Sequence, residues 1–249
     1  MTRSTFFWLL LVCSPLALAS DCKQPLDADT LNRLQLGASD VQLRPGENHQ
    51  FTLAILSTFG PAQEVPACVA WKIEPAGKGA TMSSAGLLKI DPATPPGSKF
   101  VVTADIEHGR AQRQIAVLVY TYKTQPLVGL WKQKARSGCD GTQQTRLVQP
   151  INELEFRADG WFSVTWEPFE TYRDYWGSYT AGNPGGALSL HLEQGNYLPG
   201  DFRGVGKYSL RKGGILELTG IYLGDKLAAG QAEPRKSPTE CRYLFTRIP

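Results

Sequence analysis

Short apolar runs that alternate with polar residues, broken by proline and glycine, fill most of this chain. The first half has five such runs, at residues 41–43, 51–56, 69–73, 100–106 and 114–122. Ile115, Val117 and Val119 of the last run share a face, because successive side chains of a strand alternate. About six or seven short strands in a hundred residues are typical of a β-sandwich. Only Asp29–Leu36 indicates a helix, since an acid stands where it would cap one.

The second half has the same alternation, arranged as consecutive hairpins. Its runs cover residues 128–132, 154–157, 161–166, 175–179, 187–192, 206–210, 215–218 and 243–245. Leu154 and Phe156 share a face that Phe162 and Val164 continue across the turn between them. About eight strands joined in this order suit an up-and-down β-barrel. The chain is therefore predicted to be all-β, although the irregular segment 167–174 leaves the closure of the barrel open.

The start of the chain predicts export. Arg3 precedes the apolar run Phe6–Val12, and Ala17–Ala19 provides a small-residue cleavage site, so residues 1–19 are expected to be a signal peptide. The alternative is a retained anchor, but a membrane-spanning helix needs about 20 apolar residues. We therefore expect a periplasmic or secreted protein with no transmembrane segment after signal removal.

Charge narrows the range of partners. Arg3 leaves with the signal, so the formal net charge falls from +3 to +2. Acidic and basic residues are interspersed in both halves, whereas nucleic-acid binding needs a concentrated basic face. No basic run indicates a membrane surface either. We expect no nucleic-acid partner.

Four cysteines remain in the mature chain, two in each half. An even number in an exported protein indicates disulfides. Of the three possible pairings, Cys22–Cys68 with Cys139–Cys241 is the most economical, because each bridge then stays within one half. No two cysteines have the close spacing of a zinc site, and the three histidines are isolated, so we expect no metal and no cofactor.

The first half resembles bacterial immunoglobulin-like (Big-type) domains. Four elements occur in the order of that family: Trp71–Pro75, Gly79–Leu88, Pro95–Gly97 and Val101–Ala104. The resemblance implies an immunoglobulin-like sandwich over residues 20–123, with a spacer or adhesive role. Trp71 would then fill the space between the sheets, and Gly86 would permit a tight turn.

The second half, residues 127–249, resembles lipocalin-like β-barrels. Gly129-Leu130-Trp131 matches the G-x-W that opens a lipocalin barrel, and the strands follow in the expected order. In that family a basic side chain from the last strands covers the tryptophan at the closed end. The resemblance implies this packing role for Arg242 or Arg247.

Aromatic residues near the irregular segment are the candidate binding residues. They are Trp166, Phe169, Tyr172, Tyr175, Trp176, Tyr197 and Phe202. They would either form a site at the barrel mouth or cap the core, and aromatic residues dominate cores. A glycosidase would need a carboxylate pair from Glu167, Glu170 or Asp174. His191 is expected to face solvent, and no nucleophile motif or nucleotide-binding loop occurs, so we assign no catalytic residue.

Three functions remain open. The favoured hypothesis is a non-enzymatic protein of the bacterial cell envelope, structural or protein-binding, whose barrel loops contact another envelope protein. The alternative is a lipocalin-like carrier of a small apolar or amphiphilic ligand, and a hydrolase is the least favoured. A barrel of eight strands is either filled by side chains or holds one small ligand. Whether the interior is hollow is therefore the deciding observation.

Overall fold

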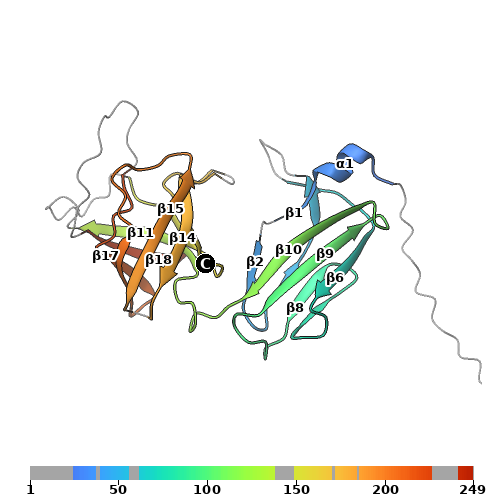
Figure 1. The fold of residues 1–249 in the computed structure, drawn as a ribbon, viewed down its shortest axis with the longest axis horizontal. Coiled ribbons are helices and arrows are strands. Elements are labelled where there is room, and N and C mark those ends of the chain that lie inside the picture. Colours follow the sequence, from blue (N-terminus) through green and yellow to red (C-terminus); the bar gives the residue numbers. More distant parts are fainter. Residues whose placement is uncertain are drawn as a thin grey trace, which may run out of the picture.

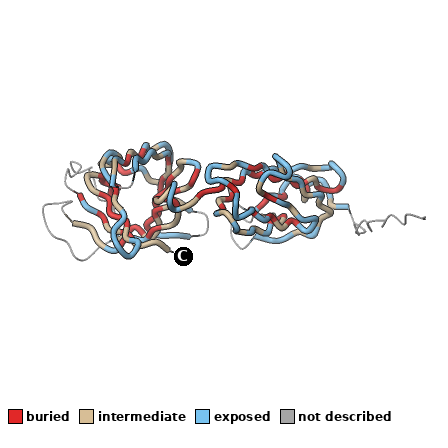
Figure 2. Tube along the Cα trace, turned by 90° about the horizontal axis from the view of Figure 1, so that it is seen from below, coloured by how far each residue is buried: buried red, intermediate tan, exposed pale blue. Residues whose placement is uncertain are grey.

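A computed structural model describes residues 25–37, 40–55, 62–137, 149–169, 172–183, 185–225 and 241–248. The protein is all-β, with 53% strand and 3% helix, as the sequence predicted. It has two lobes lying end to end, each with its own buried interior (Figures 1 and 2). The predicted signal peptide lies outside the described residues.

Within the described residues, ten strands and one helix make up the first lobe. The helix is α1 (Ala28–Arg33), and the strands are β1 (Leu34–Leu36), β2 (Asp40–Leu43), β3 (Asn48–Gln50), β4 (Leu53–Ile55), β5 (Gln63–Glu64), β6 (Val69–Glu74), β7 (Ala80–Met82), β8 (Leu87–Ile90), β9 (Lys99–Ile106) and β10 (Ala111–Val119). They form three sheets, with the orders β1-β4-β5, β2-β10-β9-β6 and β3-β8-β7. The strands outnumber the six or seven predicted, because half of them are too short to show alternation in the sequence.

One apolar core joins the three sheets of the first lobe. It contains residues from each sheet, including Leu53, Leu88 and Val102. Trp71 packs against this core, half-buried, with its ring centroid 6.0 Å from that of Phe51. Gly86 follows at a turn with φ of +83°, where a Cβ would stand 2.9 Å from both the Phe51 carbonyl oxygen and the indole of Trp71. The predicted need for glycine at this turn is confirmed.

The helix is shorter than the sequence indicated. Asp27 caps it by accepting a hydrogen bond from the Thr30 backbone N–H at 2.8 Å, and it ends at Arg33. Leu34–Leu36, predicted as the last helical residues, pair with β4 instead. Both leucines are buried there. Core packing therefore outweighs the local helical pattern.

Eight antiparallel strands close into a barrel in the second lobe. They are β11 (Gly129–Ser137), β12 (Glu153–Phe156), β13 (Trp161–Thr165), β14 (Tyr175–Ala181), β15 (Ala187–Gly195), β16 (Val205–Arg211), β17 (Ile215–Thr219) and β18 (Arg242–Ile248). Each strand pairs with its neighbours in the chain, and β18 pairs with β11 to complete the ring. The predicted number and order are confirmed, and the irregular segment between β13 and β14 does not open the barrel.

The guanidinium of Arg247 lies between two aromatic rings at the joint between the lobes. Its carbon is 4.2 Å from the ring centroid of Trp131, at the end of the barrel, and 4.2 Å from that of Tyr122, in the connection between the lobes. It donates hydrogen bonds to the carbonyl oxygens of Val128 and of Pro126, the latter at 2.8 Å. Of the two arginines proposed to cover Trp131, the structure assigns this position to Arg247.

Further contacts hold the lobes together. Gln42 of β2 accepts a hydrogen bond from the backbone N–H of Ala158, in the turn between β12 and β13. Tyr120, Val128 and Ala158 form a small buried cluster beside it. The guanidinium carbon of Arg44 also lies over the ring of Tyr122, 5.2 Å from its centroid. The connection is therefore fixed by both lobes.

Cys68 and Cys241 are each disulfide-bonded, but not to one another. Their predicted partners, Cys22 and Cys139, lie outside the described residues, so the pairing stays a prediction. Two described residues near the predicted partners in sequence support it: Leu26, four residues after Cys22, and Ser137, two residues before Cys139. The backbone N–H of Leu26 bonds to Glu107, whose own N–H bonds to the carbonyl of Cys68. In the barrel, Ser137 pairs with Arg242, next to Cys241.

We predict that Gly86→Ala destabilises the protein by about 2–4 kcal/mol, because it adds a steric clash to the cost of a positive φ. Gly97→Ala is the matched control. Its φ is +89° but no atom lies within 4 Å of the added Cβ, so about 1 kcal/mol is expected. Chemical denaturation measures both. Equal losses in the two variants would contradict the packing against Trp71.

We also predict that Arg247→Lys lowers the free energy of unfolding by about 1–3 kcal/mol. Lysine keeps the charge but cannot stack between two rings while donating to two carbonyls. Arg242→Lys, on the same strand, is the control, since Arg242 is exposed and pairs with Glu217 at 3.1 Å. Its cost should stay below about 0.5 kcal/mol. Denaturation followed by tryptophan fluorescence distinguishes these outcomes, and equal costs would contradict the role of Arg247.

Candidate functional site

The interior of the barrel is filled with aromatic side chains. The fully buried ones are Trp131, Phe156, Phe162, Tyr175, Tyr208, Tyr243 and Phe245. Together with leucines from every side of the ring they form one continuous apolar cluster. Figure 2 shows the corresponding run of buried positions around the barrel. Side chains therefore occupy the volume in which a small-ligand carrier of this fold would hold its ligand.

Buried tyrosine hydroxyls in the barrel are hydrogen-bonded to the protein backbone. Tyr175 donates to the carbonyl of Leu223 at 2.7 Å, and Tyr208 donates to that of Gly182 at 2.7 Å. Tyr243 accepts from the N–H of Leu223 at 3.2 Å. A buried hydroxyl without such a partner would destabilise the fold. These polar groups therefore serve packing and are already satisfied without a ligand.

The seven candidate binding residues divide according to burial. Trp166 and Tyr175 are buried in the core, and Tyr197 and Phe202 pack against it. Trp176 is half-buried on the outer face of β14. Phe169 is 67% exposed and Tyr172 is 39% exposed. Two of the seven, Phe169 and Tyr172, are thus exposed, and the role of all seven in binding stays a prediction.

The exposed pair belongs to an apolar rim at the end of the barrel away from the joint. We use "rim" for Phe169, Tyr172 and Leu198, the last of which is 52% exposed. Two hydrogen bonds tie the loops that carry them: the Asn196 amide donates to the Arg173 carbonyl at 2.7 Å, and the Tyr197 N–H donates to the Asp174 carbonyl at 2.9 Å. The described residues next to the rim are therefore hydrogen-bonded across the two loops.

A polar network ties the next loop to the same end of the barrel. Arg136 of β11 forms an ion pair with Asp225, whose other carboxylate oxygen accepts from the Tyr222 hydroxyl at 2.7 Å. The Tyr197 hydroxyl donates to the backbone carbonyl of Asp225 at 2.9 Å. Burial raises the pKa of the neighbouring Asp201. The ion pair of Arg136 with Asp225 and the hydrogen bonds to Asp225 therefore hold the described end of this loop against the barrel.

The carboxylates considered for hydrolysis are not arranged as a catalytic pair in the described residues. Asp174 is buried and accepts hydrogen bonds from the Trp166 N–H at 2.8 Å and the Tyr172 hydroxyl at 3.1 Å. Glu167 is exposed, and Glu170 lies outside the described residues. His191 is exposed on β15, opposite the buried leucines, as predicted. No three His, Cys, Asp or Glu side chains of the described chain gather as metal ligands.

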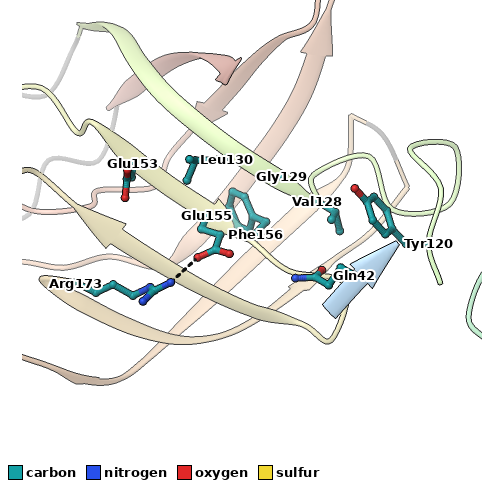
Figure 3. A pocket seen from close by; sticks show the side chains of 9 residues that line it. All are labelled: Gln42, Tyr120, Val128, Gly129, Leu130, Glu153, Glu155, Phe156 and Arg173. Atoms are coloured by element: carbon teal, nitrogen blue, oxygen red, sulfur yellow. Dashed lines mark hydrogen bonds and ion pairs between the residues drawn. The ribbon is translucent and has the colours of Figure 1, made fainter. Parts of the chain in front are cut away.

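A cleft of about 310 Å³ lies at the joint, and nothing in the sequence indicated it (Figure 3). Gln42 and Tyr120 of the first lobe line one side. The outer wall of the barrel lines the other, with Leu130 of β11 and the carboxylates Glu153 and Glu155 of β12. Burial raises the pKa of Tyr120 to about 12, so its hydroxyl stays neutral.

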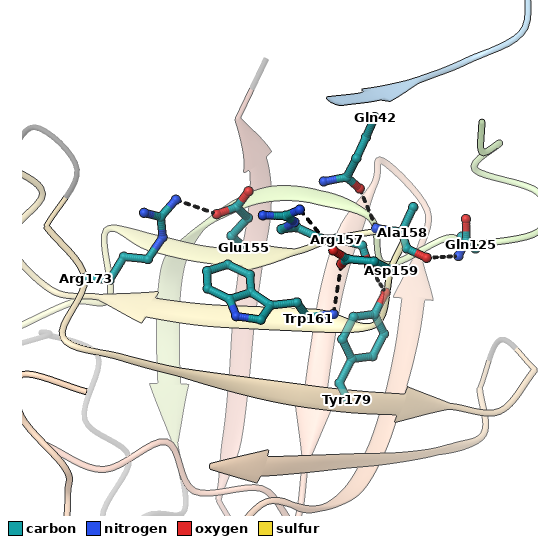
Figure 4. Close-up of polar contacts among 9 residues, drawn as sticks. All are labelled: Gln42, Gln125, Glu155, Arg157, Ala158, Asp159, Trp161, Arg173 and Tyr179. Carbon is teal, nitrogen blue, oxygen red and sulfur yellow. Dashed lines mark hydrogen bonds and ion pairs between the residues drawn. The ribbon is translucent and has the colours of Figure 1, made fainter. Parts of the chain in front are cut away.

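Arginine and tryptophan side chains cover the barrel wall beside this cleft (Figure 4). Arg173 pairs with Glu155 at 3.2 Å, and Arg157 pairs with Asp159 at 3.0 Å. Each guanidinium carbon lies 5.3 Å from the ring centroid of Trp161. The wall therefore already holds two cations by the combination of a carboxylate and an aromatic face.

No protein-family model and no curated protein matches this chain. The fold defines an all-β protein in which several small sheets precede an eight-stranded antiparallel closed barrel. Within its described residues, no helix is long and apolar enough to cross a membrane.

We predict that the barrel loses stability above about pH 10, where tyrosines of the unfolded chain ionise. Burial raises the folded-state pKa of Tyr175, Tyr179, Tyr222 and Tyr243 above that value. A raised pKa contributes stability that is complete below the unfolded pKa and is lost as the pH rises towards the folded one. Denaturation at pH 8 and pH 11, with tyrosinate absorbance, tests this. Complete ionisation of the tyrosines in a folded barrel would contradict it.

Proposed function

We propose that this chain is an exported, non-enzymatic protein of the bacterial cell envelope that binds another protein through the rim of its barrel. The filled interior carries this proposal, because it leaves the outer surfaces as the places where a partner can be bound. The same observation weighs against a carrier of a small apolar ligand. The buried, backbone-bonded Asp174 weighs against the hydrolase.

In this proposal the first lobe is an immunoglobulin-like domain of residues 20–123, and the second a lipocalin-like domain of residues 127–249. The two separate apolar cores support a boundary between Val119, which ends β10, and Gly129, which begins β11. Arg247 stacked on Trp131 is the packing expected from the lipocalin resemblance. Trp71 beside Gly86 is the arrangement expected from the immunoglobulin-like one.

The rim suits a protein partner for physical reasons. Phe169, Tyr172 and Leu198 expose apolar surface on neighbouring loops, and aromatic side chains are enriched in protein interfaces. The described residues of these loops are tied together by the Asn196 side chain and the Tyr197 backbone, which limits the conformational entropy that a partner would have to remove on binding. Export through the predicted signal peptide would bring this surface to the periplasm or the outside of the cell, where an envelope protein could bind it.

We predict that the double variant Phe169→Ser, Leu198→Ser loses its partner without losing its fold. The mature protein and this variant would be immobilised and exposed to envelope extract of the source organism. Quantitative mass spectrometry should show at least one protein whose recovery falls tenfold or more, because truncation of the few side chains that dominate an interface costs about 2 kcal/mol or more.

Leu210→Ser is the matched control, since Leu210 is also exposed but lies on β16 near the opposite end of the barrel. It should retain the same protein as the unaltered chain. Thermal unfolding checks that all three proteins are folded. An identical set of captured proteins from the rim variant and the control would refute the rim as the contact surface.

A further inference from the structure

Two carboxylates follow one another along the outer face of β12. Glu153 and Glu155 are separated by one residue, so they project on the same side about 7 Å apart along the strand. Glu155 is paired with Arg173 at 3.2 Å. The carboxylate of Glu153 has no hydrogen-bond or ion-pair partner among the described residues. Both line the cleft at the joint (Figure 3).

The ion pair between Glu155 and Arg173 indicates which kind of group can bind to this wall of the barrel. Arg173 crosses the strands so that its guanidinium meets Glu155 while also lying 5.3 Å from the ring centroid of Trp161. A cation held by a carboxylate and flanked by an aromatic face is a stronger contact than an exposed ion pair alone. Glu153, the next carboxylate on the same face of the strand, has no cation paired with it among the described residues.

The surroundings of Glu153 add an apolar surface, and the cleft lining carries one more acidic than basic residue. Leu130, whose cross-strand partner is Glu155, lies half-buried in the cleft beside the carboxylates. Among the charged residues that line the cleft, two are acidic and one is basic. Lys132 on the neighbouring strand is exposed and makes no ion pair with Glu153. Lysine and arginine cover such apolar surface with their stems while the charge stays at the water boundary.

We propose that the cleft binds a lysine or arginine side chain of a partner protein, with Glu153 pairing with its charge and Leu130 contacting its stem. The proposal rests on the proposed function only in taking the partner to be a protein. It uses a surface distinct from the rim. Gln42 and Tyr120 of the first lobe line the same cleft, whereas both residues assigned to the bound side chain belong to the barrel wall.

The test is an NMR titration of the full mature protein with two short peptides. One is acetyl-Gly-Lys-Gly-amide, and the other carries norleucine, which keeps the stem without the charge. The lysine peptide should shift the backbone amides of Leu130 and Glu153, and the norleucine peptide should bind at least fivefold more weakly. A fivefold change corresponds to about 1 kcal/mol, the upper range for one exposed ion pair.

Glu153→Gln should weaken the binding of the lysine peptide by about the same factor, fivefold. Glu193→Gln is the control, because Glu193 is an exposed acid on β15 that does not line the cleft, and it should leave binding unchanged. Equal binding of the two peptides, an unaffected Glu153→Gln variant, or no shift at the cleft amides would each overturn the proposal. The rim plays no part in this measurement. A negative result would therefore overturn the cleft proposal and leave the proposed function of the rim standing.

Discussion

The guanidinium of Arg247 between Trp131 and Tyr122 is the interaction on which the arrangement of the molecule depends. It closes one end of the barrel, and its hydrogen bonds to Pro126 and Val128 fix the connection between the lobes. Burial lowers the pKa of Arg247, but a guanidinium remains charged in proteins. The stack therefore keeps its cationic character at any pH at which the protein is folded.

Backbone geometry makes room for this stack. Gly129 has a φ of +133°, and a Cβ there would stand 2.4 Å from a guanidinium nitrogen of Arg247. The glycine of the G-x-W tripeptide is thus explained by the arginine more than one hundred residues later. Since the connection is fixed at this point, Gln42 can reach the turn at Ala158. The cleft at the joint exists because these contacts hold its two sides at a constant separation.

Alternation along the chain was sufficient to predict the barrel, because each strand buries every second side chain in one shared interior. It also separates the two arginines proposed for the closed end. Positions 242 and 247 differ by an odd number, so their side chains leave β18 on opposite faces. Arg247 leaves on the face of Tyr243 and Phe245, which are buried in the barrel. The sequence alone did not place Arg247 opposite Trp131, because that depends on the register between β18 and β11.

The candidate site was less predictable, for two physical reasons. The segment around Phe169 and Tyr172 has no regular period, so nothing in it distinguishes exposed from buried aromatics, and Trp166 and Tyr175 nearby lie in the core. The cleft joins Gln42 to Glu155, which are distant in sequence and share no motif. The helix prediction for Leu34–Leu36 was wrong for a different reason, because pairing with β4 outweighed the local helical spacing.

The filled interior of the barrel changes what the first lobe could contribute to binding. If the barrel held its ligand inside, the first lobe would be a spacer and its orientation would matter little. With an interior packed with side chains, a binding function would use the outer wall and the rim. One side of the cleft in the wall is lined by Gln42 and Tyr120. Apolar contacts at a rim supply affinity, whereas an uncompensated carboxylate such as Glu153 selects by charge and orients the partner. In the function proposed here, the fixed joint thus makes the first lobe part of the recognition surface.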